Sequence, residues 1–364
     1  MRKIFKFIGW LVGLFLLYIV GFLLFGTFTD WQPEGTTALS PSAGQVAPEP
    51  VIQDSVVSLL SWNVGYGGLG DKDLLFYNQP AGFWWTKPGR VRMSEERVNS
   101  NVIGQEITLK SNPADLYLLQ EVDTAARRSH YTNQLATARS ARPDHAAYFA
   151  ANFKSKHIPL PLFQPWDHYG YVVGGLVNLS RHHPVASERI QLPGEYAWPT
   201  KVFQLDRCAL RQAFSVAGGK ELVVYNVHLS AYDKGGDIRR QQMEKLREMV
   251  LADYEAGNYA IVGGDWNQLP PGFNWFSMNP TVKVTQLPMA IAHDFMPPGW
   301  KYAYDPGTPT VRSSAYPYVK NRTRIKVIDF YLLSPNLRIK VVKGLDQSFR
   351  YSDHQPVYVE VELL

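Results

Sequence analysis

Six short polar motifs in this chain carry residue types that bind a hard metal ion or transfer a proton. Each lies at one end of an apolar, strand-like run and presents a carboxylate, an amide or an imidazole. Carboxylate and amide oxygens are the ligands that Mg²⁺ prefers, and an imidazole titrates near neutral pH. Because strand ends are where rigid scaffolds present reactive groups, the motifs predict one site assembled from distant segments. They are Ser61–Val64, Gln120–Val122, Asn226–Leu229, Gly264–Asn267, Ile328–Tyr331 and Ser352–His354.

The elements that must position these motifs are strands interrupted by two long helices. We expect the helices at Ser94–Lys110 and Asp237–Ala256, where Gly257 can terminate the second one. Strands and helices mixed in one unit predict an α/β architecture. The expected strands are Val56–Trp62, Asp115–Glu121, Tyr171–Leu179, Phe203–Val216, Glu221–His228, Tyr259–Asp265, Ile325–Leu333 and Val357–Leu363.

The N-terminus has the composition of a membrane anchor. Residues 7–28 are almost wholly apolar and uncharged, which is long enough to cross a hydrocarbon core of about 30 Å. Three basic residues precede this run, so the positive-inside rule predicts a cytoplasmic N-terminus and an extracytoplasmic folded domain. The alternative is a cleaved signal peptide, but the run is long for one and ends without an A-x-A-like cleavage site.

Composition divides the chain into an anchor, a linker and one large domain. Its 364 residues are 45% hydrophobic, which supports a real core. We expect the anchor at 1–28, a flexible linker rich in Pro, Ser and Gly at 29–51 and the folded domain at 52–364, as a monomer. The net charge is +5, but three of these charges precede the apolar run. The weak remaining surplus does not by itself indicate a nucleic-acid partner, and a single cysteine excludes a disulfide framework.

Two further features bear on function. Residues 66–93 form a long aromatic insertion broken by glycine and proline, and we expect it to be functional. The pattern Gly65–Gly70 matches the glycine spacing of dinucleotide sites, but no helix can open there, so we reject that interpretation. Without further ligands at a suitable spacing, we expect His182–His183 and His293–Asp294 to be solvated loop residues.

Taken together and in this order, the motifs resemble those of the endonuclease/exonuclease/phosphatase superfamily, which includes deoxyribonucleases, sphingomyelinases and inositol-phosphate phosphatases. The resemblance covers roughly residues 56–364. It implies a two-sheet, four-layer α/β sandwich with the site at one end, here preceded by the transmembrane helix. His228 matches a histidine that these three branches carry in the Asn-x-His motif. Abasic-site endonucleases lack a histidine at this position.

The resemblance implies a divalent-cation site. It makes Glu121 the main metal ligand, with Asn63 beside it, and Mg²⁺ the expected ion, for which Mn²⁺ or Ca²⁺ could substitute. Asp353 would take a metal-side or structural role. Asp265 and Asn267, two residues apart, can face the same way and address one phosphate and its attacking water.

The resemblance also implies the acid–base groups. His354 would be the general base, oriented by Asp329, and His228 would stabilise or protonate the leaving side. Asn226 lies on the same strand face as His228 and would contact the substrate phosphate or form structural hydrogen bonds. Arg207 would contact the phosphate or form a structural salt bridge.

These expectations describe a membrane-anchored, divalent-metal-dependent phosphodiester or phosphomonoester hydrolase. Its substrate would be nucleic acid or a phospholipid head group, between which the sequence does not decide. The alternative is a catalytically silent binding or scaffold protein on the same fold. That hypothesis predicts erosion of the motif residues, and none is visibly eroded.

Overall fold

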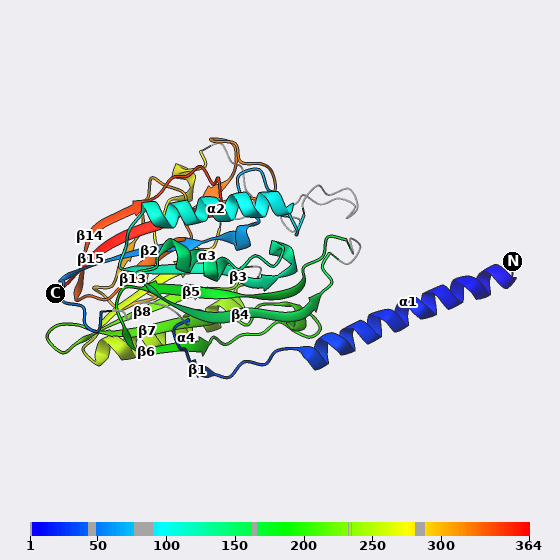
Figure 1. Ribbon diagram of the computed structural model, residues 1–364, viewed down its shortest axis with the longest axis horizontal. Coiled ribbons are helices and arrows are strands. Elements are labelled where there is room, and N and C mark those ends of the chain that lie inside the picture. The colour runs from blue at the N-terminus through cyan, green and yellow to red at the C-terminus, as the bar shows by residue number, and fades with distance from the viewer. Residues whose placement is uncertain are drawn as a thin grey trace.

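The computed structural model shows two β-sheets packed face to face, with helices outside them and one long helix projecting from the end of the sandwich (Figure 1). Because the inward faces of both sheets are apolar, burying them against each other removes both from water. The described residues are 2–42, 49–75, 90–161, 166–231, 233, 235–280 and 288–364.

The larger sheet has seven strands in the order β1-β6-β7-β8-β9-β13-β10. Strands β8 and β9 are parallel, and β13 runs antiparallel to β9. Their bounds are β1 Thr36–Ala38, β6 Pro184–Gln191, β7 Cys208–Ser215, β8 Glu221–His228, β9 Tyr259–Asp265, β10 Lys301–Ala303 and β13 Asp329–Leu333.

The second sheet has six strands in the order β14-β15-β2-β3-β5-β4. Strands β2 and β3 are parallel, whereas β15 runs antiparallel to β2. A separate two-stranded ribbon joins β11 (Val311–Arg312) to β12 (Ile325–Lys326). The six strands are β2 Val56–Asn63, β3 Leu116–Ala126, β4 Ala146–Ile158, β5 Gly170–Ser180, β14 Leu337–Gly344 and β15 Val357–Leu363.

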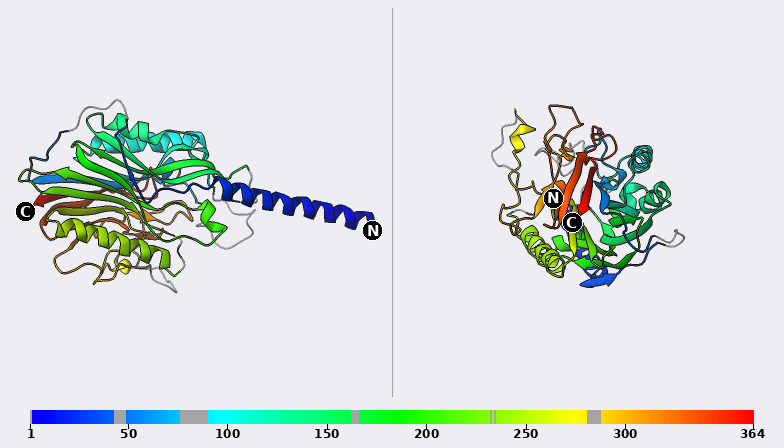
Figure 2. Two further views of the ribbon diagram at one scale, coloured as in Figure 1. Left: turned by 90° about the horizontal axis from the view of Figure 1, so that it is seen from below. Right: turned by 90° about the vertical axis from the view of Figure 1, so that its left-hand side faces the viewer.

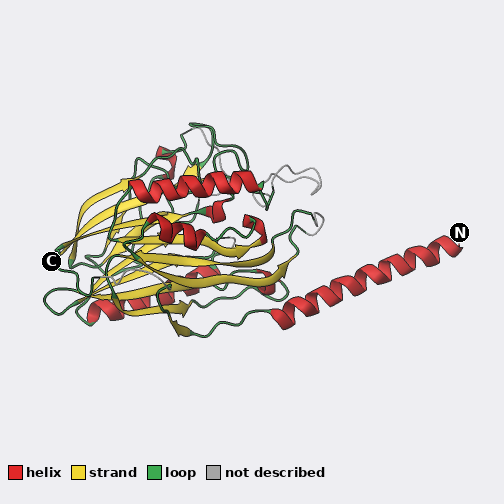
Figure 3. Cartoon of the chain, in the orientation of Figure 1, coloured by secondary structure: helices red, strands yellow, loops and turns green. Residues whose placement is uncertain are grey.

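Helices complete a four-layer arrangement (Figure 3). Between the sheets lies one apolar core, which includes Leu59, Leu118, Ile261 and Val359. Helix α4 (Asp237–Glu255) packs on the outer face of the larger sheet through Met243, Leu246 and Val250. On the outer side of the six-stranded sheet lie α2 (Glu95–Ser111) and α3 (Gln134–Ala141), which contribute Leu109, Ala138 and Ala141 to the core there. The α/β sandwich expected from the sequence is therefore confirmed.

Most expected elements are present, with two differences. The run expected as one strand at Ile325–Leu333 is split into β12 and β13, because Thr310 Oγ1 accepts the N–H groups of Ile328 and Asp329. The strand expected at Phe203–Val216 begins only at Cys208, after a 3₁₀ turn at Thr200–Phe203. Elements β1, β4, β6, β10, β11, β14 and α3 were not expected from the sequence.

The N-terminal segment is an apolar helix, α1 (Arg2–Thr29), long enough to span a membrane. Residues 29–51, expected to be a flexible linker, include strand β1, which pairs with β6. Beyond β1, Ser42 donates its N–H to the carbonyl of Ala147. This part of the tether is therefore docked on the sandwich, whereas the division at residues 28 and 51 stays a prediction.

Candidate active site

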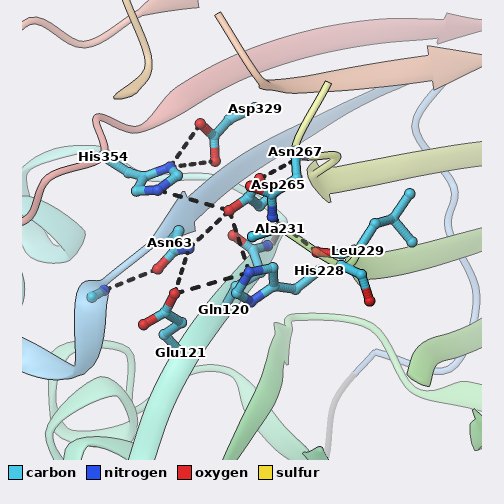
Figure 4. A network of polar contacts seen from close by, with 12 residues as sticks. Asn63, Gln120, Glu121, His228, Leu229, Ala231, Asp265, Asn267, Asp329 and His354 are labelled. Atoms are coloured by element: carbon cyan, nitrogen blue, oxygen red, sulfur yellow. Dashed lines mark hydrogen bonds and ion pairs between the residues drawn. The ribbon is translucent and has the colours of Figure 1, made fainter. Parts of the chain in front are cut away.

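Pairing of the strands brings the polar motifs to one end of the sandwich. In the parallel pair β8–β9, His228 lies opposite Asp265, and in the antiparallel pair β9–β13 Asp265 lies opposite Asp329. Asn63 ends β2 in the facing sheet. Figure 4 shows these side chains converging with Glu121 and His354 between the two sheets.

A β-bulge points Glu121 toward the other site residues. The pairing of β3 with β5 shifts register between Leu119 and Val122, and Glu121 has a φ of 54°, in the left-handed region. Such a backbone conformation is uncommon for a non-glycine residue and is typical of functional positions. The side chain of Asn63 holds this carboxylate, because its Nδ2 lies 3.2 Å from Glu121 Oε1 and 3.0 Å from Asp265 Oδ2.

The oxygen of the Asn63 side chain is already engaged. Asn63 Oδ1 accepts the N–H of Gly65 at 3.0 Å, so the amide presents its NH₂ group to the carboxylates. This arrangement orients Glu121 and Asp265, and the expectation that Asn63 itself ligates a cation stays a prediction.

His354 is fixed on both sides of its ring. Its Nδ1 lies 2.9 Å from Asp329 Oδ2, and its Nε2 lies 3.7 Å from Asp265 Oδ2. Its carbonyl accepts the indole N–H of Trp62 at 3.0 Å. Burial alone would lower the pKa of His354, but the carboxylates of Asp329 and Asp265 raise it to about 10. The two carboxylates therefore favour the protonated ring, and the role of general base for His354 stays a prediction.

Asp265 is the central acceptor of the site. It is buried, and its Oδ2 faces Asn63 as well as the Nε2 atoms of His228 and His354. Burial, and then the neighbouring charge of Asp329, raise the pKa of Asp265 to about 6. A carboxylate with a raised pKa is a stronger proton acceptor than an ordinary aspartate.

His228 and Asn267 border the same space. His228 Nε2 lies 3.5 Å from Asp265 Oδ2, while its buried Nδ1 has no hydrogen-bond partner among the described residues. Burial, and then the charge of Arg207, hold the pKa of His228 well below its usual value. The ring is therefore neutral at neutral pH and cannot act as a general acid. The backbone N–H of Asn267 donates to Asp265, and its side chain donates to the carbonyl of Leu229.

The donor set fits a divalent cation at Glu121 and Asp353. Both carboxylates line the same cavity, and the charge of Glu121 adds to the burial that raises the pKa of Asp353 to about 6. Such mutual repulsion is relieved by a cation between the groups. Ligand atoms of Asp265, Asp329 and His354 also approach within 4.8 Å of one another, but Nδ1 of the histidine is already bonded to Asp329.

The two weaker candidates form hydrogen bonds to groups other than the site carboxylates. Arg207 lines the cavity and donates through Nη1 to the carbonyl of His228 at 3.2 Å, so it supports that histidine. Asn226 is fully buried beneath the site. Its side-chain nitrogen donates to Leu119, Val177 and Asn178, and its oxygen accepts from Gln120. These bonds favour the structural alternative for Asn226 over contact with substrate.

The cavity itself has a volume of 760 Å³ and extends well beyond the motifs. Sequence reasoning missed several polar residues that line it, since they follow no motif and come from separate segments. Four of them have a buried nitrogen without a partner in the described part of the chain, namely Asn152 Nδ2, Arg239 Nε, Gln268 Nε2 and Arg312 Nε.

Two other expectations have different outcomes. His182 is buried and lies 3.6 Å from Glu49, so the expectation of a solvated loop residue is wrong for it, although His183, His293 and Asp294 are exposed. Most of the aromatic insertion, residues 76–89 with both of its tryptophans, lies outside the described residues.

Comparisons with known proteins agree with this architecture. No family model matches the sequence, and no curated protein matches it either. An endonuclease/exonuclease/phosphatase from Beutenbergia cavernae DSM 12333 matches with a TM-score of 0.56 and 18% identity, over 85% of this chain and 72% of that one. One from Bacteroides vulgatus matches with a TM-score of 0.53 and 14% identity, over 85% of this chain and 100% of that one.

A third similar structure is ANGEL2, a 2′,3′-cyclic phosphatase in complex with adenosine-2′,3′-vanadate. It matches with a TM-score of 0.50 and 14% identity, over 90% of this chain and 99% of that one. At these identities the likeness concerns the fold. The chain therefore has the fold of the endonuclease/exonuclease/phosphatase family.

Proposed function

We propose that this protein is a divalent-metal-dependent hydrolase of phosphodiesters. The observation that carries the proposal is the convergence of Glu121, Asp265 and His354 around one cavity, with Asp329 bonded to His354, on a fold shared with phosphate-ester hydrolases. Carboxylates can hold a cation that neutralises charge on a phosphate and can activate water, and these are the two requirements of the reaction.

Each residue of the site has a role that follows from its contacts. Asp265 accepts the proton of the attacking water, because it is a central buried carboxylate that faces both imidazoles. His354, held as an imidazolium by Asp329, donates Nε2–H to a phosphoryl oxygen and stabilises its growing charge. Neutral His228 supplies one uncharged hydrogen bond, and Asn267 borders the phosphate.

Glu121 and Asp353 would hold the cation, which we propose to be Mg²⁺. When bound, it supplies positive charge that neutralises a phosphoryl oxygen and the leaving oxygen. The protein's own contribution is to place both carboxylates on the wall of the same cavity, and Asn63 holds Glu121 there.

The test is hydrolysis of bis(4-nitrophenyl) phosphate, plasmid DNA and RNA by the full-length protein in detergent, with Mg²⁺ or EDTA. We expect Mg²⁺-dependent turnover that falls about 10²–10⁴-fold in Asp265→Asn. The matched control is Asp237→Asn, which removes an exposed aspartate that pairs with Arg240 on α4. A folded protein with equal turnover in both variants would contradict the proposal.

We also propose that α1 is retained as a membrane anchor with the domain on the extracytoplasmic side. Its length and apolarity support a span, and its C-terminal turns contact the sandwich, which a removable signal peptide does not require. Membranes washed at high pH should retain the protein, and its intact mass should include residues 1–29. Release by the wash, or a mass lacking these residues, would refute the anchor.

A further inference from the structure

We infer that the cavity opens toward the membrane and that the substrate is a phospholipid of the bilayer, cleaved at the phosphodiester bond of its head group. This inference rests on the proposed function and names its substrate class. It depends on where α1 meets the sandwich relative to the cavity.

The catalytic end of the sandwich and the attachment of α1 lie on the same side of the molecule. Strand β2 begins beside the C-terminus, where Leu363 donates its N–H to Ser55, and ends at Asn63 in the site. Figures 1 and 2 show the C-terminus at the end of the sandwich away from α1. The site therefore faces the direction in which α1 projects.

The last turns of α1 dock on the turn that forms one wall of the cavity. Phe22 stacks on Phe203 with ring centroids 5.5 Å apart and an interplanar angle of 16°. Gly26 is buried there, and a Cβ at this position would lie 3.2 Å from Val202. Trp198 donates its indole N–H to Thr27 Oγ1 at 3.0 Å. Because Phe203 also lines the cavity, the same side chain contacts both the helix and the candidate active site.

Helix geometry places this contact at the surface of the bilayer. About 20 residues cross a hydrocarbon core of about 30 Å, so a span that starts after Lys6 reaches the far boundary near Gly26. Two exposed tryptophans are consistent with a position at this boundary of the bilayer, since tryptophan is enriched at membrane interfaces. Trp198 is 56% exposed, and Trp166, close to the ring contact of His168 with His157, is 72% exposed. Phe203 therefore lies at the level of lipid head groups.

The cavity has the polarity that an entering phospholipid requires. Its wall next to α1 is apolar and contains Phe203, Leu205 and Ile158, whereas its far side holds the carboxylates and imidazoles of the site. A head-group phosphate can reach Asp265 while the glycerol or sphingoid end stays on the apolar wall. Exposed Lys154 and Lys156, on the strand that also contacts Phe22 through His157, add attraction for an anionic bilayer.

The reaction requires water as the only co-reactant. A water oxygen bonds to phosphorus, one P–O ester bond breaks, and the proton taken by Asp265 returns to the departing oxygen. The products are an alcohol and a phosphomonoester, one of which remains in the bilayer.

The test compares two glycines of α1 in full-length protein reconstituted into vesicles of phosphatidylcholine and phosphatidylglycerol, with Mg²⁺. In Gly26→Leu the new side chain collides with Val202 and Phe203 and displaces the helix from the cavity wall. Gly21→Leu is the matched control, because a Cβ there has nothing within 4 Å. Hydrolysis is measured on the vesicle lipids and, separately, on bis(4-nitrophenyl) phosphate.

We expect wild type and Gly21→Leu to hydrolyse vesicle lipid, and Gly26→Leu to lose about tenfold on lipid while keeping its rate on the soluble ester. Trp198→Ala, which loses the bond to Thr27 without new bulk, should lose lipid activity in the same selective way. Turnover of the soluble ester, DNA or RNA without lipid hydrolysis would overturn this inference and leave the proposed function standing. Equal losses on both substrates would also overturn it, and silence on every substrate would overturn the proposed function as well.

Discussion

Asp265 and Asp329 lie directly opposite each other on neighbouring antiparallel strands, and the imidazole of His354 is placed between their carboxylates. Two negative carboxylates directly opposite each other on neighbouring strands repel, so the pair would be unfavourable without a proton or a cation beside it. The protonated ring compensates both carboxylates. This relationship raises the pKa of His354, and the charge of Asp329 adds to the burial that raises the pKa of Asp265.

Replacing Asp329 by asparagine should therefore change the charge of His354 rather than its position. We expect kcat to fall about 10²-fold or more with a small change in KM, since the interaction develops with charge on the phosphate. The measurement is steady-state hydrolysis of a soluble phosphodiester together with the NMR titration of His354. An unchanged kcat, or an unchanged titration, would refute this role for Asp329.

Binding of Mg²⁺ should stabilise the folded protein even when no substrate is present. A ligand at 100 times its dissociation constant adds about 2.7 kcal/mol to the free energy of unfolding, so Tm should rise in Mg²⁺ and fall back in EDTA. Glu121→Gln should remove most of this rise, because it removes one of the two proposed ligands. A rise of equal size in the variant would place the cation elsewhere.

Alanine variants of Asn226 and Asn267 should differ in whether they lose stability or activity. Asn226→Ala leaves several buried polar groups without partners, so the free energy of unfolding should drop by about 3 kcal/mol. Asn267→Ala, at the border of the cavity, should reduce kcat/KM with a smaller loss of stability. Denaturant unfolding and steady-state kinetics on both variants decide the matter. A stable Asn226→Ala protein with low activity would instead support contact between Asn226 and the substrate.

Asp206, which lies outside the candidate active site, should make the free energy of unfolding depend on pH. Burial, and then the charge of Asp30, raise the pKa of Asp206 to about 7. Because its unfolded pKa is about 3.9, the folded state binds more protons between these values, and stability falls as the pH rises from about 4 to about 7.

Asp206→Asn should match wild type at pH 4 and be more stable by about 2 kcal/mol at pH 8, a value reduced from the full shift for partial solvent screening. Denaturant unfolding in detergent micelles at both pH values measures this difference. A difference that is the same at pH 4 and pH 8 would show that the carboxylate is not the cause.

Strands β2, β8 and β9 could be predicted because each is a buried apolar run that ends in a polar residue of the site. The bounds of β8, β9 and β15 agree with the sequence pattern residue for residue. Their pairing then determines which motifs meet. Strand β4 was missed because it shows no clean alternation of apolar and polar residues, and its burial depends on its neighbour β5.

The rest of the site depends on contacts that no local pattern encodes. The bulge that rotates Glu121 into the cavity arises from the register of β3 against β5. Arg239 and Arg312 reach the cavity from a helix and a ribbon that are distant in sequence. The proton on His354 follows from two carboxylates on other strands, so the sequence could suggest a histidine–aspartate pair but not its charge.

The most direct test of the central claim is hydrolysis of a soluble phosphodiester by the full-length protein in water enriched in ¹⁸O, with Mg²⁺. Attack of water on phosphorus predicts one ¹⁸O atom in each phosphomonoester product, with the label absent when EDTA replaces Mg²⁺ and its formation strongly reduced in Asp265→Asn. A folded, Mg²⁺-supplied protein that yields no labelled phosphomonoester, or that labels the alcohol instead, would contradict the assignment of this site to phosphodiester hydrolysis.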